Sequence, residues 1–406
     1  MEIKLTKDGL TKTGVILLLL SGLVFHDFFA LKYVKLGVIT ITYLRVILVV
    51  TIPLLLFLYK VRIRKNDILA YILLIFLAYG LTRIEGNLKE AFALYCPIVA
   101  FYILYFSIDN RKTLDKCIDF LALAFMFFCL VGLIELITGC HFVETRIEEM
   151  NLNKRFACGM YFNENDFSAY LSVSFIFLFL SKFKKTTKVI FAALGILIII
   201  VNSSIICILG LISVFLLYFI FKNRTNRFFR FGLVISLFLI LLFPITKLIK
   251  SSSIWWRTNM YEFGFKNVLS HMWIGTGIGK YNEEMLLLGF DDKQYGASAD
   301  PHNLFFELAG VFGIVWAILL IVLLFRLFIW YLKMPKTKEN ILCAGLVLII
   351  PFIGLASSSC MEKNFIYLAL LIPIIQYRFY KNRFSNVEKN TFIVETNIPS
   401  YKFLNE

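Results

Sequence analysis

Long apolar runs separated by short polar segments make up most of this chain. A run of about 20 apolar residues is long enough for a helix to cross a bilayer. The pattern therefore predicts an all-α integral membrane protein of about 12 transmembrane helices. The predicted spans are residues 13–31, 36–59, 67–82, 88–107, 117–138, 161–181, 187–201, 204–221, 229–248, 303–330, 340–357 and 364–380.

The composition agrees with lipid around the outside of the fold. Of the 406 residues, 59% are hydrophobic and 17% are charged, whereas soluble domains are about 45–50% apolar and about 25% charged. This excludes a disordered chain, a collagen, a secreted disulfide scaffold and a soluble enzyme. The first apolar run lacks a small-residue cleavage site, so we expect a first span rather than a cleaved signal peptide.

The net charge of +15 follows the predicted topology, because Lys and Arg concentrate in cytoplasmic loops. With the amino terminus inside, the inner segments carry most of the Lys and Arg, including the runs 60–65 and 182–185. We therefore predict cytoplasmic termini and basic anchors near anionic membrane lipid, with no nucleic-acid partner. The predicted organisation is a polytopic membrane domain, residues 1–383, followed by a loosely ordered polar cytoplasmic tail, residues 384–406.

Two predicted loops on the outer, extracytoplasmic side are long. They span residues 139–160 and 249–302, and long loops in a compact protein usually carry function. All four His residues, at positions 26, 141, 271 and 302, fall at or beyond this face. A transporter of two six-helix halves would instead carry its longest loop inside, between spans six and seven. The sequence therefore favours a functional site at the outer face.

The sharpest local signal is Asp300-Pro301-His302-Asn303, just before the tenth predicted span. Asp is a favoured N-cap and Pro a favoured first helical residue, which places His302 in the first turn. The helix dipole there favours a neutral imidazole that can accept a proton. Either Asp300 or Glu307 could orient the ring. The alternative is that these residues only begin a well-capped transmembrane helix.

Each long loop also contains an Arg. The second loop has Arg257 and then Gly275-Thr276-Gly277-Ile278-Gly279, which favours a tight turn near a ligand, since no strand precedes it for a dinucleotide loop. The first loop has Arg155, and either Asn163 or Asn165 is suited to cap the next span. Each Arg could bind a substrate phosphate or only anchor its loop at lipid headgroups.

The remaining polar residues predict structural pairing rather than metal chemistry. Arg45, near the middle of the second span, and Glu135, near the outer end of the fifth, are expected to pair with other polar groups. Neither the eight Cys nor the four His have metal-site spacing, so no metal or cofactor is predicted. A disulfide between Cys140 and Cys158 is left open, because both belong to one outer loop.

In their order and spacing, the outer segments resemble the bacterial O-antigen ligases and O-antigen or capsular polysaccharide polymerases. Arg155, Gly159 and Asn163-Glu164-Asn165-Asp166 resemble the segment that opens a span in this family. Arg257 with residues 275–279 resembles its long-loop signature, and His302-Asn303 with Gly313 its His-Asn, nine residues, Gly pattern. Two departures are Asn202-Ser203-Ser204, where the family often has an Arg, and Trp316, where ligases have a small residue or Tyr.

This resemblance implies a GT-C-like glycosyltransferase in the bacterial cytoplasmic membrane with an extracytoplasmic active site. It would be a polysaccharide polymerase that transfers a glycan from undecaprenyl diphosphate to a lipid-linked repeat unit. The alternatives are an O-antigen ligase acting on a lipid A core or other acceptor, and a lipid-linked glycan flippase or transporter. The reaction would be inverting and independent of metals, and the pathway's chain-length regulator and flippase would be partners.

The resemblance also assigns roles to individual residues. His302 would be the general base, and Arg155 and Arg257 would bind the diphosphate. Supporting roles would fall to Asn303, Asp300, Glu307, Asn165, Arg45 and Gly277.

Overall fold

The computed structural model of the chain describes residues 11–25, 35–36, 39–40, 42–59, 68–85, 88–143, 145, 155–222, 252–289, 302–357 and 359–395. Its elements, in chain order, are α1 (Lys12–Val24), β1 (Lys35–Leu36), β2 (Ile39–Thr40), α2 (Tyr43–Pro53) with the π-helical turn η1 (Leu54–Leu58), α3 (Ile68–Leu81), α4 (Leu88–Ser107), α5 (Arg111–Thr138), α7 (Glu164–Leu180), α8 (Lys185–Val201), α9 (Ile205–Lys222), α11 (Ser252–Ser270), α12 (Tyr281–Leu287), α14 (Leu304–Phe312), α15 (Ile314–Lys333), α16 (Lys338–Ala356), the 3₁₀ turn η3 (Cys360–Glu362) and α17 (Asn364–Glu395).

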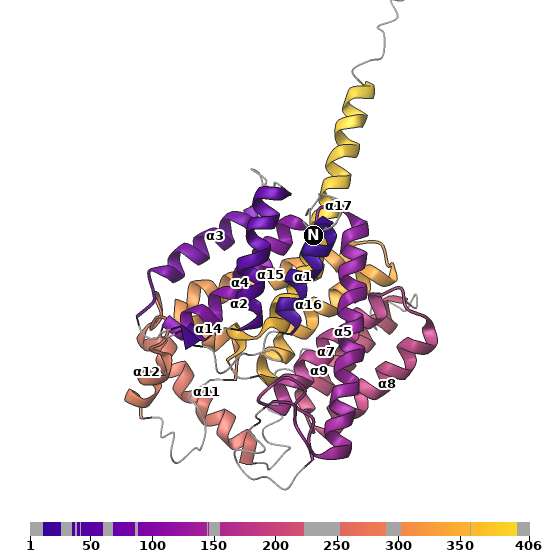
Figure 1. The fold of residues 1–406 in the computed structure, drawn as a ribbon. Helices are drawn as coiled ribbons and strands as arrows, with labels where there is room; N and C mark the ends of the chain where they lie inside the picture. Colours follow the sequence, from indigo (N-terminus) through magenta and orange to yellow (C-terminus); the bar gives the residue numbers. More distant parts are fainter. Residues whose placement is uncertain are drawn as a thin grey trace, which may run out of the picture.

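The helices form a bundle (Figure 1). Apolar side chains lie both in its core and on its surface. In the described part, α4 from Glu90 onward, α5, α15 and α16 are each long and apolar enough to cross a membrane. Helix α15 leaves Val315, Ile318 and Phe325 exposed, which is unfavourable in water but not in lipid. The architecture is that of a helical membrane protein.

Each predicted span contains a helix, apart from residues 229–248, which lie outside the described residues. The number of membrane crossings stays a prediction. The second span differs from expectation, because a short antiparallel hairpin of β1 and β2 comes first and α2 begins only at Tyr43. Thr42 caps this helix by accepting the amide of Arg45 at 3.4 Å. Arg45 therefore lies in the first turn of its helix and not near the middle of a span.

Two other boundaries also differ from expectation. The tenth predicted span is two helices, because Gly313 adopts φ 96° and ψ 157° and separates α14 from α15. At the carboxyl end, α17 continues to Glu395. The predicted boundary between membrane domain and tail, at residues 383 and 384, therefore falls inside a helix.

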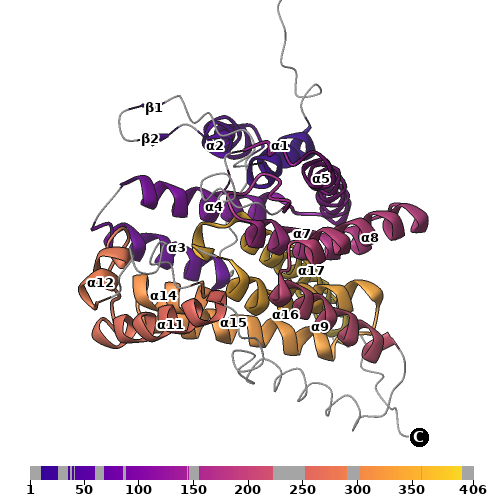
Figure 2. The same ribbon diagram turned by 90° about the horizontal axis from the view of Figure 1, so that it is seen from below.

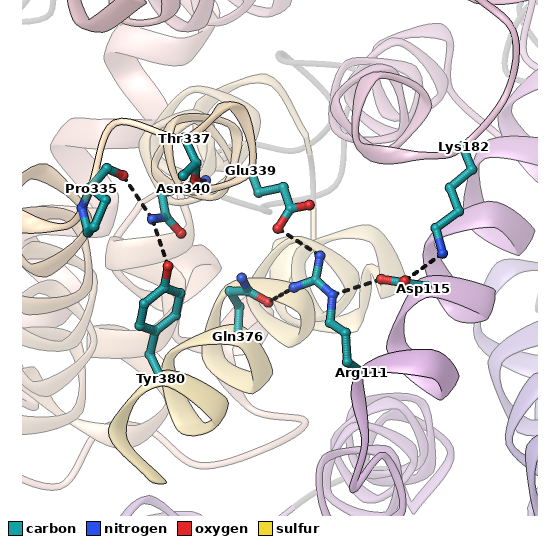
Figure 3. Close-up of polar contacts among 9 residues, drawn as sticks. All are labelled: Arg111, Asp115, Lys182, Pro335, Thr337, Glu339, Asn340, Gln376 and Tyr380. Carbon is teal, nitrogen blue, oxygen red and sulfur yellow. Dashed lines mark hydrogen bonds and ion pairs between the residues drawn. The ribbon is translucent and has the colours of Figure 1, made fainter. Parts of the chain in front are cut away.

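Polar contacts join the ends of several helices on one side of the bundle, which we call the Arg111 end. Arg111 contacts Asp115 and Glu339, each at 2.8 Å, and Gln376 of α17 (Figure 3). Lys182, just after α7, reaches Asp115 at 2.7 Å. These contacts join the starts of α5 and α16 to the end of α7, as the predicted up-and-down order of the spans requires.

The helix ends on the opposite side of the bundle are called the His302 end. It contains the last residues of α5, α8 and α16 and the starts of α7, α14 and α17, with α11 and α12 beside α14 (Figure 2). All of these segments fall on the outer side in the topology predicted from charge.

Candidate functional site

The start of α14 is built around Asn303. Its side-chain Oδ1 accepts the amides of Phe305 at 2.9 Å and Phe306 at 3.2 Å, which is the bonding of an N-cap. This corrects the cap predicted at Asp300, which with Pro301 lies outside the described residues. Asn takes the position because its short side chain reaches the free amides of the first turn.

His302 consequently precedes the helix instead of lying in its first turn. Its backbone adopts φ 44°, and its carbonyl accepts a hydrogen bond from the Tyr261 hydroxyl at 3.3 Å. The residue is half-buried. It lies beside the amino-terminal end of α14.

Glu307 joins α14 to the start of η3. Its Oε2 accepts the amide of Cys360 at 2.6 Å, and its Oε1 accepts that of Met361 at 3.1 Å. Both carboxylate oxygens are therefore engaged by backbone amides at the turn before α17. In the sequence, Glu307 was one of two residues that could orient the His302 ring, and that role stays a prediction beside this bridging role.

The glycine-rich segment 275–279 docks the second long loop onto the break between α14 and α15. The amides of Thr276 and Gly277 donate to the carbonyls of Gly310 and Val311 at 2.7 and 3.0 Å, and Ile314 donates to Met272 at 2.8 Å. The Arg83 guanidinium donates to the carbonyl of Gly275 at 2.9 Å. The loop is thereby fastened to the chain's own backbone.

Gly277 illustrates why this segment needs glycine. Its φ is 91°, and a Cβ at this position would lie 2.9 Å from the carbonyl oxygen of Arg83. The close approach that the sequence suggested does occur, but the group approached is the loop after α3. Whether the segment also approaches a ligand stays a prediction, and its Gly279 lines a small cavity.

The first long loop is held by Glu135, which is fully buried near the end of α5. Its Oε2 accepts the amides of Cys158 at 2.8 Å and Gly159 at 2.7 Å, and Nδ1 of His141 lies 3.7 Å from Oε1. The structural pairing predicted for Glu135 is confirmed. Arg155, which is exposed, donates to the carbonyl of Ile137 at 3.4 Å.

Asn202 occupies the region where the family often has an Arg, and it has a structural role. Its Nδ2 donates to the carbonyl of Ala157 at 2.8 Å and to Ser168 Oγ at 3.1 Å, while its Oδ1 accepts the Ala157 amide at 2.9 Å. This amide side chain ties the first long loop to α7. The sequence offered no sign of this role beyond the departure from the family pattern.

The start of α7 carries an ion pair that sequence reasoning missed. Asn163 caps the helix by accepting the amide of Asn165 at 2.7 Å, which decides between the two predicted caps. Asp166 then bonds to Ser357 Oγ and pairs with Lys363 Nζ at 2.8 Å. In the sequence, the only sign of this ion pair was that Lys363 is a charged residue immediately before the last predicted span. Its ammonium brings a cation to the His302 end.

These contacts form a continuous series from Arg155 through α7 and η3 to α14. Arg45 belongs to the same end, because it lies 5.7 Å from the ring centre of Phe92 in the early part of α4. This contact is with an aromatic ring, so the pairing with another polar group expected of Arg45 stays a prediction. Arg257 lies within α11, and its side chain is outside the described residues.

Two cavities flank α14. An apolar cavity of about 190 Å³ is lined by Leu304, Leu308 and Trp316, together with side chains of α3, α4 and α17. A small polar cavity of about 70 Å³ is lined by Glu90, Glu307 and Glu362 with Gly279 and Asn282. Met361 lines both. Carboxylates of this kind accept hydrogen bonds from hydroxyl groups, whereas the larger cavity suits a hydrocarbon chain.

All eight Cys are free thiols, with Cys140 exposed and Cys158 buried, so the disulfide that the sequence left open is not formed. Among the described residues, no cluster of three or more His, Cys, Asp or Glu could hold a metal ion. No protein-family model matches the chain, and no curated protein matches it. The family resemblance of the outer segments therefore remains a hypothesis.

Proposed function

We propose that this protein is a membrane glycosyltransferase that polymerises lipid-linked glycans at the outer face of the bacterial cytoplasmic membrane. The observation that carries the proposal is the pair of cavities beside α14. An amphiphilic donor needs an apolar channel for its prenyl chain and hydrogen-bonding groups for its sugars. Leu304 and Leu308 face the apolar cavity, and Glu307 of the same helix faces the polar one.

In the proposed reaction, an acceptor hydroxyl attacks the anomeric carbon of the donor sugar. His302 takes the proton of that hydroxyl as the new glycosidic bond forms. The bond from the anomeric carbon to the diphosphate oxygen breaks, and its electron pair leaves with the prenyl diphosphate. Arg155 and Arg257 would stabilise the departing charge. Lys363 is a third candidate, because it brings a cation to the same end beside η3.

The acceptor is proposed to be a second lipid-linked repeat unit. The resemblance supports this through the Asn163-Glu164-Asn165-Asp166 segment, and Trp316 departs from the ligase pattern. A ligase would use the same donor but a different acceptor, such as a lipid A core. A flippase would move the lipid-linked glycan without making a bond.

Purified protein incubated with lipid-linked repeat units and no other acceptor separates these functions. Polymerisation gives a ladder of lengthening glycans. A product that forms only after a lipid A core is added means a ligase, and transport without new bonds means a flippase.

His302→Ala tests the site within this assay. An oriented general base contributes about 10² to 10⁴ in rate, so the variant should lose nearly all ladder formation while keeping its detergent melting temperature. His271→Ala is the matched control, since His271 is also half-buried at the His302 end and its Nδ1 contacts Ser270 Oγ at 2.9 Å. Equal activity of the two variants would refute the assignment of His302.

A further inference from the structure

A separate cavity of about 430 Å³ opens near the Arg111 end, between α7, α8, α9 and α16. Figure 2 shows α8 and α9 on the opposite side of the bundle from α12. Three lysines line this cavity, Lys185 and Lys188 of α8 and Lys338 of α16. The rest of its wall is mainly apolar, with Phe175, Phe179 and Phe215 among the lining residues. It therefore combines three cations with a hydrocarbon surface.

Lys188 is the buried member of the three, with 8% of its surface exposed. Its ammonium donates to the carbonyl of Phe179 at 3.4 Å and to that of Ser181, at the end of α7, where a cation is favourable. The charge of Lys338 acts on Lys188 unfavourably. Both lysines line the same cavity.

The start of α8 adds to this positive charge. Lys184 occupies the N-cap position without a side-chain hydrogen bond, and the first turn of α8 contains no acidic residue. A helix amino terminus has free amides and a partial positive charge, and acidic groups or bound anions normally occupy such a position. Here the sequence supplies lysines instead, which leaves the region strongly electropositive.

The nearby carboxylates already have other cationic or amide partners. Asp119 accepts the amide of Lys182 at 2.8 Å, and Glu339 pairs with Arg111 at 2.8 Å (Figure 3). Both act favourably on the cavity lysines, but Glu339 also pairs with Arg111, and neither carboxylate lines the cavity. The cavity therefore keeps an excess of positive charge.

We propose that this cavity binds one anionic phospholipid, with its phosphate among Lys185, Lys188 and Lys338 and an acyl chain along the aromatic wall. The amphiphilic lining favours a phospholipid over free phosphate, which would leave the aromatic wall uncovered. In the topology predicted from charge, this end faces the cytoplasm, where basic residues meet anionic lipid. The proposal does not depend on the reaction assigned to His302.

Native mass spectrometry of the full chain in detergent tests the site. The protein is titrated with phosphatidylglycerol and, separately, with phosphatidylcholine of the same acyl chains. We expect one tightly retained phosphatidylglycerol and much weaker retention of phosphatidylcholine. Equal retention of the two lipids would overturn the proposal. Displacement of phosphatidylglycerol by millimolar inorganic phosphate would also overturn it, because the site would then be one for a free anion.

The double variant Lys185→Gln/Lys338→Gln removes two charges whose side chains are exposed, and it leaves the buried Lys188 in place. It should bind phosphatidylglycerol about 10-fold to 30-fold more weakly, from the usual contribution of each basic residue near anionic lipid. Lys112→Gln/Lys116→Gln is the matched control, since both lysines are exposed on α5 and neither lines the cavity. The proposal fails if the two double variants bind the lipid equally.

Val189→Trp provides a test that leaves every charge in place. Val189 lines the cavity and is 55% exposed, so an indole at this position should occupy the acyl region without disturbing the core. Retention of phosphatidylglycerol should fall at least 10-fold. Unchanged retention by this variant would show that the lipid does not enter the cavity.

Discussion

Gly313→Ala tests how the second long loop is held against the break between α14 and α15. The φ of 96° and ψ of 157° at this residue belong to a region that only glycine adopts readily, at a cost of about 1–3 kcal/mol for other residues. A Cβ would also lie 2.2 Å from the carbonyl oxygen of Trp273. Because the obstructing atom is backbone, the loop itself must move away.

That movement would break docking hydrogen bonds. Three backbone bonds join the loop to this region, from Thr276 to Gly310, from Gly277 to Val311 and from Ile314 to Met272. Each contributes about 0.5–1.5 kcal/mol. With the backbone strain, even the lower ends of these ranges give a loss of about 2.5 kcal/mol, which corresponds to a change on the order of a hundredfold in the opening equilibrium.

Hydrogen exchange followed by mass spectrometry measures this opening directly. Peptides covering residues 272–279 and 311–314 should exchange about a hundredfold faster in Gly313→Ala than in the parent. Gly139→Ala is the control, because Gly139 also has a positive φ, of 74°, but no atom lies within 4 Å of a Cβ placed there. Exchange of these peptides within threefold of the parent in Gly313→Ala would refute the docking argument.

Three further substitutions test other contacts. Glu307→Gln leaves one acceptor oxygen for the amides of Cys360 and Met361, so the turn should lose about 1.5–3 kcal/mol of stability and the amide hydrogens of residues 359–363 should exchange faster. The exposed Glu262→Gln is its control. Equal exchange in the two variants would contradict the bridging role of Glu307. Glu135→Gln should speed maleimide labelling of the buried Cys158 relative to the exposed Cys140, because Glu135 accepts the Cys158 amide. Glu283→Gln is its control, and the same labelling ratio in the two variants would show that Glu135 does not hold the first long loop. Leu308→Trp should fill part of the apolar cavity and raise the KM for a lipid-linked donor at least 10-fold. The control Val315→Trp changes an exposed residue and should leave this KM unchanged. An unchanged KM in Leu308→Trp would mean that the prenyl chain binds elsewhere.

The helices were largely predictable because helix formation in a membrane protein depends on local composition. In lipid, a run of about 20 apolar residues forms a helix, because every backbone amide must be hydrogen-bonded within the segment. The helix boundaries were less predictable. The hairpin before α2 lies inside an apolar run, and hydropathy does not distinguish its strands from the start of a helix.

The candidate site was predictable only in part. Residues in polar loops identified the His302 end, and Glu135 was correctly expected to pair with other groups. The partners themselves were not visible, because they come from distant positions. Asp166 and Ser357, for example, are 191 positions apart, and Lys363 joins them only when α16 and α17 pack beside α7.

The sequence by itself determined a helical membrane protein whose unusual polar residues concentrate in two long loops. Both properties follow from composition within segments of about 20 residues. Only the tertiary structure decided that Asn303 caps α14, that Gly313 ends it and that Gly277 approaches backbone of the same chain. Those outcomes depend on atoms brought together by folding, such as the Trp273 carbonyl that excludes any side chain at Gly313.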